Sequence, residues 1–324
     1  MKTFNKIPIL ILIVITTQTS CEKIFFGEPQ TNNTAVFEEI WRYIDDYYCC
    51  HEFVSVDWDS IYQVYSDRVD DNMESPVFLV LMDEMLQHLQ DPKVGLATNS
   101  GEFYYEDTTQ YTANLDTNTV KFYNPTYGTV TIDGIAYVNR DIGWSDSYSS
   151  IIGDMPKGLI IDLRGMNEET ESRGSGGNLG LFISSDDQTV VGNALEKRGP
   201  GEDNFVSRPF NLWGAGFGYQ DKYENPVVVL INRKVAAQWT TLAFRLSNLP
   251  NVTLMGDRTG GYTNGGNCYL LSNGWFIQCL HFAVVDLSGN CVSCSGVEPD
   301  IYINDDPVTT DVDEIIEAAL QFLN

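Results

Sequence analysis

The sequence predicts an α/β fold in which a small N-terminal helical domain precedes a mixed sheet flanked by helices. Residues 35–92 carry apolar side chains at the spacing of amphipathic helices. From about residue 93, short apolar runs that are typical of buried strands alternate with helical patterns and turn residues. Such alternation indicates an α/β or mixed sheet. The 324 residues suffice for one large domain or two modest ones.

Residues 1–20 are expected to be a signal peptide that takes no part in the fold. Two lysines precede an apolar run over 7–15, which is shorter than the ~20 residues that span a bilayer. The run ends at Cys21, in a context that resembles a bacterial lipobox. We therefore expect a lipidated Cys21, a polar tether over 21–34, and a lipoprotein anchored in the bacterial cell envelope, periplasmic or on the outer surface. An ordinary cleaved signal with an incidental cysteine is the alternative.

Three helices are expected within 35–92. Thr34 and Asp57 can cap the first two, because their side-chain oxygens can accept a free N–H group of the first turn. A Ser-Pro pair at 75–76 starts the third helix, with proline at a position that needs no N–H. This helix should end before Pro92.

The expected α/β domain, residues 93–324, contains strands and two further helices. A hairpin with an Asn-Gly turn is expected around residues 273–274. The other predicted elements are a strand–turn–strand unit over 128–138, strands over 158–163, 226–232 and 252–255, and helices over 237–247 and 311–323.

Six cysteines follow Cys21, and an even number in an exported chain predicts disulfides. Counting outward from the hairpin turn places Cys268 opposite Cys279, at a Cα separation of ~4.5–5.5 Å that a disulfide can bridge. The remaining four are Cys49, Cys50, Cys291 and Cys294, whose pairing stays open. A zinc site built from these four and His51 is the alternative, although Cys-Cys-His is poor ligand spacing.

The charge of the chain excludes one class of partner. It carries 19 Lys and Arg against 45 Asp and Glu, a formal net charge of −26. Nucleic-acid affinity depends on neutralising phosphates with basic side chains, so we expect no nucleic-acid partner. We also expect no cofactor and no bound metal, and contact with the membrane through the lipid anchor alone.

The segment 226–243 reads as a buried strand, a sharp turn and a helix. In hydrolases such a junction often carries the nucleophile, because the start of a helix offers free N–H groups to an oxyanion. The residue at this turn is Ala237, which has neither a hydroxyl nor a thiol.

Eight segments follow one another in the order of a known family: 37–48, 56–59, 86–94, 158–165, 198–201, 232–233, 256–261 and 296–301. Together they resemble the tail-specific, or C-terminal processing, serine peptidases, in the branch shared with tricorn protease and retinoid-binding-protein-like modules. The similarity extends over about residues 35–324, without the PDZ-like insert that many relatives carry.

The resemblance implies a ClpP/crotonase-like mixed sheet and assigns catalytic positions that this sequence does not fill. The nucleophile position is Ala237, the lysine-base position is Tyr262, and the histidine-base position is Lys93. The expected acidic residue is absent from 291–295. Main-chain groups that could still line a groove or an oxyanion hole are those of Gly165, Ala237, Gln238, Gly261 and Tyr262.

The resemblance therefore implies a serine peptidase-like domain with impaired catalysis, which binds peptide or protein termini in the former substrate groove. An active serine-type or threonine-type endopeptidase with displaced residues is the first alternative, with Thr240 as nucleophile and Lys93 as base. Binding of an apolar small molecule in the groove is the second.

Overall fold

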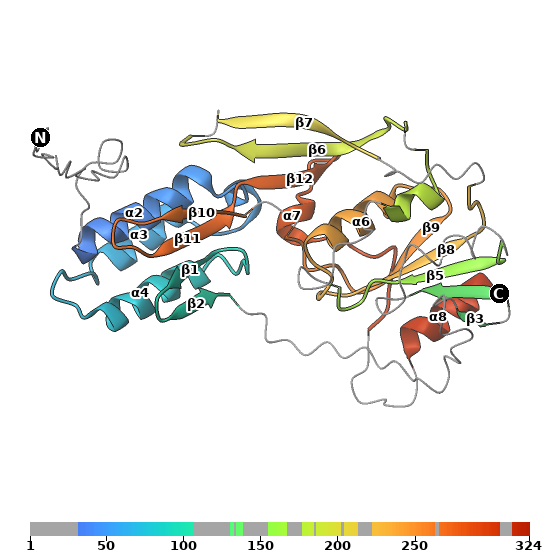
Figure 1. Cartoon of the computed structure of the whole chain (residues 1–324), viewed down its shortest axis with the longest axis horizontal. Coiled ribbons are helices and arrows are strands. Elements are labelled where there is room, and N and C mark those ends of the chain that lie inside the picture. Colours follow the sequence, from blue (N-terminus) through green and yellow to red (C-terminus); the bar gives the residue numbers. More distant parts are fainter. Residues whose placement is uncertain are drawn as a thin grey trace, which may run out of the picture.

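The computed structural model describes residues 32–105, 130–132, 134–138, 155–166, 177–184, 186–201, 204–212, 222–262, 266–304 and 313–324. The predicted signal peptide, Cys21 and most of the tether lie outside these residues. The fold is mixed α/β with a helical region at the N-terminal end, as the sequence predicts (Figure 1). Within the described part of the chain, no helix combines the length and apolar character needed to cross a bilayer.

The helical region consists of α2 (Asn33–Tyr47), α3 (Trp58–Ser66) and α4 (Ser75–Gln87), with a short 3₁₀ turn η1 (His51–Phe53) after the first. Asp57 caps α3 as predicted, accepting the N–H of Ser60 at 3.0 Å. The predicted cap of α2 is wrong: Asn32 accepts the N–H of Ala35 at 2.9 Å, and Thr34 lies inside the helix. An amide oxygen two residues earlier thus satisfies the free N–H group.

The strands form three sheets. A four-stranded sheet has the order β10-β11-β1-β2, a three-stranded sheet β12-β6-β7, and a six-stranded sheet β13-β9-β8-β5-β4-β3. Their bounds are β1 Gly95–Thr98, β2 Gly101–Tyr104, β3 Val130–Ile132, β4 Ile135–Val138, β5 Gly158–Asp162, β6 Val190–Lys197, β7 Phe205–Asn211, β8 Val227–Ile231, β9 Val252–Gly256, β10 Gly266–Leu270, β11 Phe276–Leu280, β12 Phe282–Asp286 and β13 Ile301–Tyr302.

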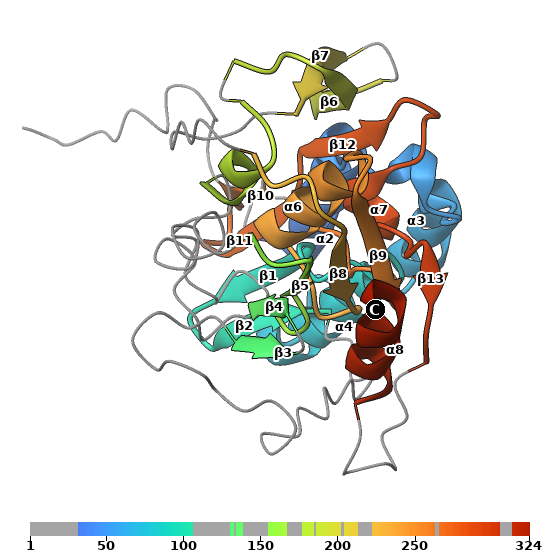
Figure 2. The ribbon, with the colours of Figure 1, turned by 90° about the vertical axis from the view of Figure 1, so that its right-hand side faces the viewer.

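The six-stranded sheet lies between α6 (Gln238–Ser247) and α8 (Glu314–Leu323) (Figure 2). Its strands run parallel except β3. Alternate residues of each strand point to opposite faces. On β8, Val227 and Val229 belong to the core beneath α6, whereas Val228 and Leu230 belong to the core beneath α8. Burial on both faces explains the continuous apolar runs of these strands.

The helical region does not close its own core. The buried side chains of α2 and α4 pack with apolar residues of β1 and β11, among them Leu96 and Ile277. β1 follows α4 directly in the chain, whereas β11 comes from residues 276–280, and both strands lie beside the helices (Figure 1). The helical region is therefore completed by a distant hairpin, β10–β11, whose position no local sequence pattern predicts.

The hairpin β10–β11 forms, but its register differs from the predicted one. Cys268 pairs with Gln278, and Cys279 pairs with Asn267. The main chain closes between Leu271 and Trp275, so the loop holds three residues rather than two. One extra residue moves every pair by one position and turns the two cysteines to opposite faces. The predicted Cys268–Cys279 disulfide is wrong, and both thiols are free.

Two shorter elements complete the description: a 3₁₀ helix η2 (Gly177–Leu181) and a single helical turn α7 (Val292–Ser295). The long antiparallel pair β6–β7 was not predicted, because its sequence lacks clear alternation and its outer strand is largely exposed. In Figure 1, this pair and β12 run along one side of the molecule, between the helical region and the six-stranded sheet.

Candidate functional site

The junction between β8 and α6 keeps the geometry of a strained turn although its residue is alanine. Ala237 has φ 56° and ψ −132°, and its side chain is fully buried. A residue other than glycine in such a conformation costs about 1–3 kcal/mol and persists only where its surroundings impose it. The sequence predicted the position of this turn, but nothing in the sequence predicted that the strain would survive there.

Hydrogen bonds from two neighbouring segments hold the turn. The N–H of Ala236 donates to the carbonyl of Met166 at 2.9 Å, after the end of β5. The N–H of Ala237 donates to the carbonyl of Gly261 at 3.2 Å, after the end of β9. The strained residue is therefore fixed between the two strands that flank β8 in the sheet.

Thr240, the fallback nucleophile, lies on the buried side of α6. Its hydroxyl donates to the carbonyls of Val235 at 3.0 Å and Gly261 at 2.9 Å, and the residue is fully buried. The hydroxyl proton is thus committed to main-chain oxygens. In this geometry Thr240 ties the helix to the Gly261 segment and presents no oxygen to a substrate.

Tyr262 occupies the lysine-base position and also has a positive φ, 59°. Its N–H donates to the carbonyl of Ser293 in α7 at 2.8 Å. Its side chain is half-buried against the core of the helical region. Tyr262 therefore lies where α7 and the helical region meet the strained turn at Ala237, which we call the elbow.

Lys93 occupies the histidine-base position, next to a buried carboxylate. The N–H of Lys93 donates to Asp91 Oδ1 at 2.7 Å, and the hydroxyl of Tyr48 donates to Asp91 Oδ2 at 2.9 Å. Burial lowers the pKa of Lys93, against the opposing effect of Asp91. Burial raises the pKa of Asp91 to about 6, although these two donors oppose the shift.

The pKa of Tyr48 is raised by burial first and then by Asp91, with a smaller contribution from Tyr262. No role in the site was predicted from the sequence for Asp91 or Tyr48. A carboxylate between the end of a buried helix and a buried strand was the available signal.

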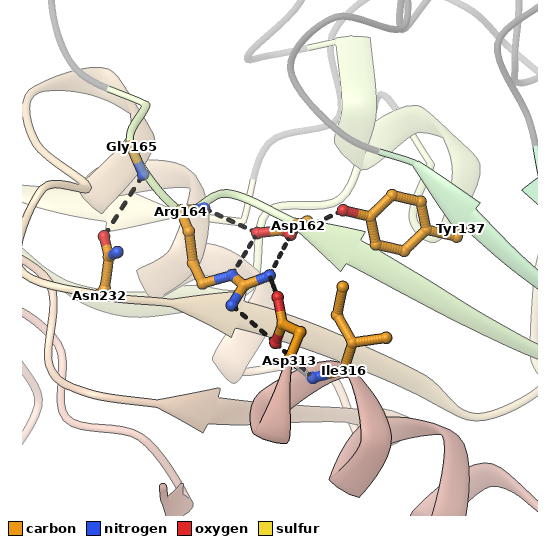
Figure 3. Close-up of polar contacts among 7 residues, drawn as sticks. All are labelled: Tyr137, Asp162, Arg164, Gly165, Asn232, Asp313 and Ile316. Atoms are coloured by element: carbon orange, nitrogen blue, oxygen red, sulfur yellow. Dashed lines mark hydrogen bonds and ion pairs between the residues drawn. The ribbon is translucent and has the colours of Figure 1, made fainter. Parts of the chain in front are cut away.

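Gly165 follows β5 in a turn that a buried ion-pair network fixes (Figure 3). Arg164 is bound by two carboxylates, with N–O distances of 2.7 Å to Asp162 and 2.8 Å to Asp313. Asp313 also caps α8, and Tyr137 donates its hydroxyl to Asp162 at 2.8 Å. The network joins β4, β5 and α8 directly beneath Gly165, whose φ of 76° suits glycine.

Three of the main-chain N–H groups that could have formed an oxyanion hole donate to protein acceptors. Gly165 donates to Asn232 Oδ1 at 3.4 Å, Ala237 to Gly261, and Tyr262 to Ser293. Gln238 is the first residue of α6, and Gly261 supplies the carbonyl that accepts from the elbow. These three donors are directed into the protein, which is not the geometry that stabilises an oxyanion.

The cysteines of the predicted disulfide set divide into two groups. The sulfur atoms of Cys50, Cys291 and Cys294 lie within 4.8 Å of one another, and Cys294 is placed for a disulfide with either of the other two. Cys49 is a free, buried thiol. His51 does not join this group, since its Nε2 contacts the carbonyl of Ile44 at 3.0 Å. Three sulfurs could also hold a metal ion, with no fourth His, Cys, Asp or Glu among the described residues grouped with them.

The arrangement as a whole lacks the parts of an acyl-transfer centre at the expected places. Acyl transfer needs a nucleophile, a base within hydrogen-bond reach, and donors for the oxyanion. The turn at Ala237 offers a methyl group, the two base positions hold Lys93 and Tyr262, and the N–H groups of Gly165, Ala237 and Tyr262 are occupied. What remains at the turn is a buried main-chain scaffold with no nucleophilic side chain at residue 237.

Comparisons with known proteins agree with this architecture. Residues 126–303 match peptidase family S41, and residues 29–87 match the tricorn protease C1 domain. A protein from Parabacteroides merdae, crystallised as a candidate peptidase, is 26% identical with a TM-score of 0.77, and the match covers 91% of this chain and 97% of that one. No curated protein matches the chain.

Two more distant structures share the fold. The photosystem II D1 C-terminal processing protease is 13% identical with a TM-score of 0.52, over 89% of this chain and 97% of that chain. Mature CPAF is 11% identical with a TM-score of 0.56, over 90% of this chain and 95% of that chain.

Proposed function

The chain belongs to peptidase family S41, and we propose that it is a non-catalytic member that binds extended peptides or protein termini in the former substrate groove. The observation that carries this proposal is Ala237. It keeps the strained backbone of a nucleophile elbow but has only a methyl side chain. The scaffold of the site is thus maintained without the atom that would attack a peptide bond.

The neighbouring positions support the same interpretation. Tyr262 cannot serve as a lysine base, and Lys93 has no hydroxyl or thiol at the elbow to activate. Removal of the triad from a serine peptidase leaves about 10³–10⁴-fold acceleration over water, which comes from oxyanion donors and binding. Here even the N–H donors of Gly165 and Ala237 are occupied, so we expect a smaller residual acceleration of peptide hydrolysis.

Binding does not need those groups. An extended peptide can add to a sheet edge through main-chain hydrogen bonds, and side-chain contacts then select it. Tyr262 supplies an aromatic ring and Lys93 a positive charge at the two former base positions, which suits a peptide that ends in a free carboxylate.

The catalytic half of the proposal is tested with a fluorophosphonate probe on the purified protein. We expect no labelling of the wild type or of Ala237→Ser, with an active serine peptidase in the same tube as positive control. If the probe labels the wild type and Thr240→Ala abolishes that labelling, the alternative holds: an active peptidase with displaced residues. Labelling of Ala237→Ser alone would show that Lys93 or Tyr262 can act as a base.

The binding half is tested with an array of 15-residue peptides carrying free carboxylates and the same peptides amidated. We expect binding to a subset, weakened at least tenfold by Tyr262→Ala and, for free carboxylates only, by Lys93→Met. Arg68→Ala is the control, because Arg68 pairs with Glu84 on the exposed surface of the helical region. Equal binding by all three variants would refute this location of the site.

We further propose that the protein is exported and anchored as a lipoprotein in the bacterial envelope. The apolar run over 7–15 and the lipobox-like context of Cys21 support this. Metabolic labelling with an alkyne fatty acid should mark the wild type and fail to mark Cys21→Ala. Equal labelling of both proteins would refute the anchor.

A further inference from the structure

Cys294 has two sulfur partners and can bond to only one at a time. The Cα atoms of Cys50 and Cys294 lie 5.9 Å apart, and those of Cys291 and Cys294 lie 5.3 Å apart. Both separations fall in the range of ordinary disulfides. Because the three sulfurs lie together within 4.8 Å, either bond can form without rearrangement of the main chain.

We propose that Cys50, Cys291 and Cys294 form a thiol–disulfide exchange site in which Cys294 alternates between two partners. The bond to Cys50 joins α7 covalently to the helical region, across a sequence separation of 244 residues. The bond to Cys291 is local, with a separation of three residues, and leaves the helical region unlinked. A disulfide of the surroundings, such as oxidised glutathione, supplies the first oxidation, in which two thiols lose two electrons and two protons.

The exchange step itself needs no further oxidant. The thiolate of Cys291 attacks Sγ of Cys294, and the Cys294–Cys50 bond breaks as the Cys291–Cys294 bond forms. The electron pair leaves with Sγ of Cys50, which takes up a proton, while the proton of Cys291 has gone to water. One disulfide and one thiol enter the step, and one of each leaves it.

The surroundings of the three sulfurs suit these roles. The N–H of Cys294 donates to Sγ of Cys291 at 3.1 Å, which favours the thiolate that attacks. Sγ of Cys49 lies 3.9 Å from Sγ of Cys50 and can donate to it as it leaves. Burial raises the pKa of Cys49, so this neighbour remains a protonated thiol and does not compete as a nucleophile.

Access to the site is through Cys294. Cys50 and Cys291 are buried, whereas Cys294 is half-buried. An external disulfide therefore meets the shared sulfur first. The carbonyl of Ser293, the residue before Cys294, accepts a hydrogen bond from the N–H of Tyr262. The disulfide that forms or breaks at Cys294 therefore lies one residue from a contact of the candidate site.

A gel can separate the two disulfide-bonded forms of the protein, because their disulfides close chain loops of very different length. Full-length protein is equilibrated with oxidised and reduced glutathione at pH 8, quenched in acid, alkylated and run on a non-reducing denaturing gel. The Cys50–Cys294 form closes a large loop and migrates faster than the Cys291–Cys294 form. We expect both bands in the wild type, only the fast band in Cys291→Ser, and only the slow band in Cys50→Ser.

Cys49→Ser is the matched control and should keep both bands, with fragment mass spectra confirming which cysteine is bonded. Each wild-type form, separated at acid pH without alkylation and returned to pH 8 without external thiol, should regenerate the other, at least about tenfold faster than at pH 5, since the thiolate is the attacking species. Alkylating the free thiols first should abolish the conversion. A single wild-type band, a fast band that depends on Cys49, or three free thiols holding one equivalent of zinc would overturn the proposal.

Discussion

Replacing Arg164 by methionine should destabilise the fold by about 4 kcal/mol, because it leaves two buried carboxylates without their cation. The guanidinium makes four hydrogen bonds of 2.7–3.0 Å to Asp162 and Asp313. All three residues are at most 7% exposed. Breaking a buried ion pair by removing one partner costs about 3–5 kcal/mol, since the remaining charge stays buried.

We expect the cost of Arg164→Met to lie within the range of about 3–5 kcal/mol rather than above it. Each carboxylate keeps other donors: Asp162 accepts from the hydroxyl of Tyr137 and Asp313 from the N–H of Ile316. Methionine has nearly the length of arginine, so loss of packing adds little. The pKa of Arg164 is raised, because the two carboxylates outweigh the effect of burial; the wild-type cation therefore stays charged throughout the accessible pH range.

Urea unfolding followed by tryptophan fluorescence at pH 7 measures the effect. The control is Arg198→Met, which removes an exposed, solvent-screened ion pair with Glu196 and should change the free energy of unfolding far less. At pH 5 the cost of Arg164→Met should shrink, because an unpaired buried carboxyl can take up a proton and become neutral. Equal costs for the two variants, or a cost that grows on acidification, would refute the reasoning.

Three further predictions concern the site and its surroundings. Since the pKa of Asp91 rises from 3.8 to about 6 on folding, this group makes stability fall by about 2 kcal/mol as pH rises from 4 to 6, and Asp91→Asn should remove that slope from a pH series of urea unfolding. Thr240→Val should lower the free energy of unfolding by only about 1 kcal/mol, measured by thermal unfolding, because both carbonyls that accept from the Thr240 hydroxyl keep another N–H donor. A cost above about 3 kcal/mol would contradict this. In the chain-entropy account, the Cys50–Cys294 form locked by Cys291→Ser should be up to about 3–4 kcal/mol more stable than the form locked by Cys50→Ser, and equal midpoints would contradict it.

The sequence predicted elements whose cause is local. The buried strands at β5, β8 and β9 were recognisable as apolar runs, and Asp57 as a cap, because each depends on neighbouring residues only. The turn at Ala237 was placed from the strand and helix on either side of it.

The rest depended on contacts between distant segments. β1 pairs with β11, and the helices pack on both strands. These contacts join residues almost two hundred positions apart, so no local sequence pattern predicts them. The hairpin register depended on one residue in a loop, and a shift of one position reverses the facing of Cys268 and Cys279. The cluster of Cys50 with Cys291 and Cys294 likewise required the tertiary fold.

The strain at Ala237 follows from these long-range contacts. A conformational cost of about 1–3 kcal/mol is comparable to the net stabilisation from two or three hydrogen bonds, each worth roughly 1 kcal/mol. Bonds from Ala236 to Met166, from Ala237 to Gly261 and from Thr240 to Gly261 lie around the turn and supply that amount. None of these bonds uses the side chain of residue 237. The elbow is therefore a property of the sheet and its neighbours, and it can persist when the nucleophile is absent, as a binding scaffold requires.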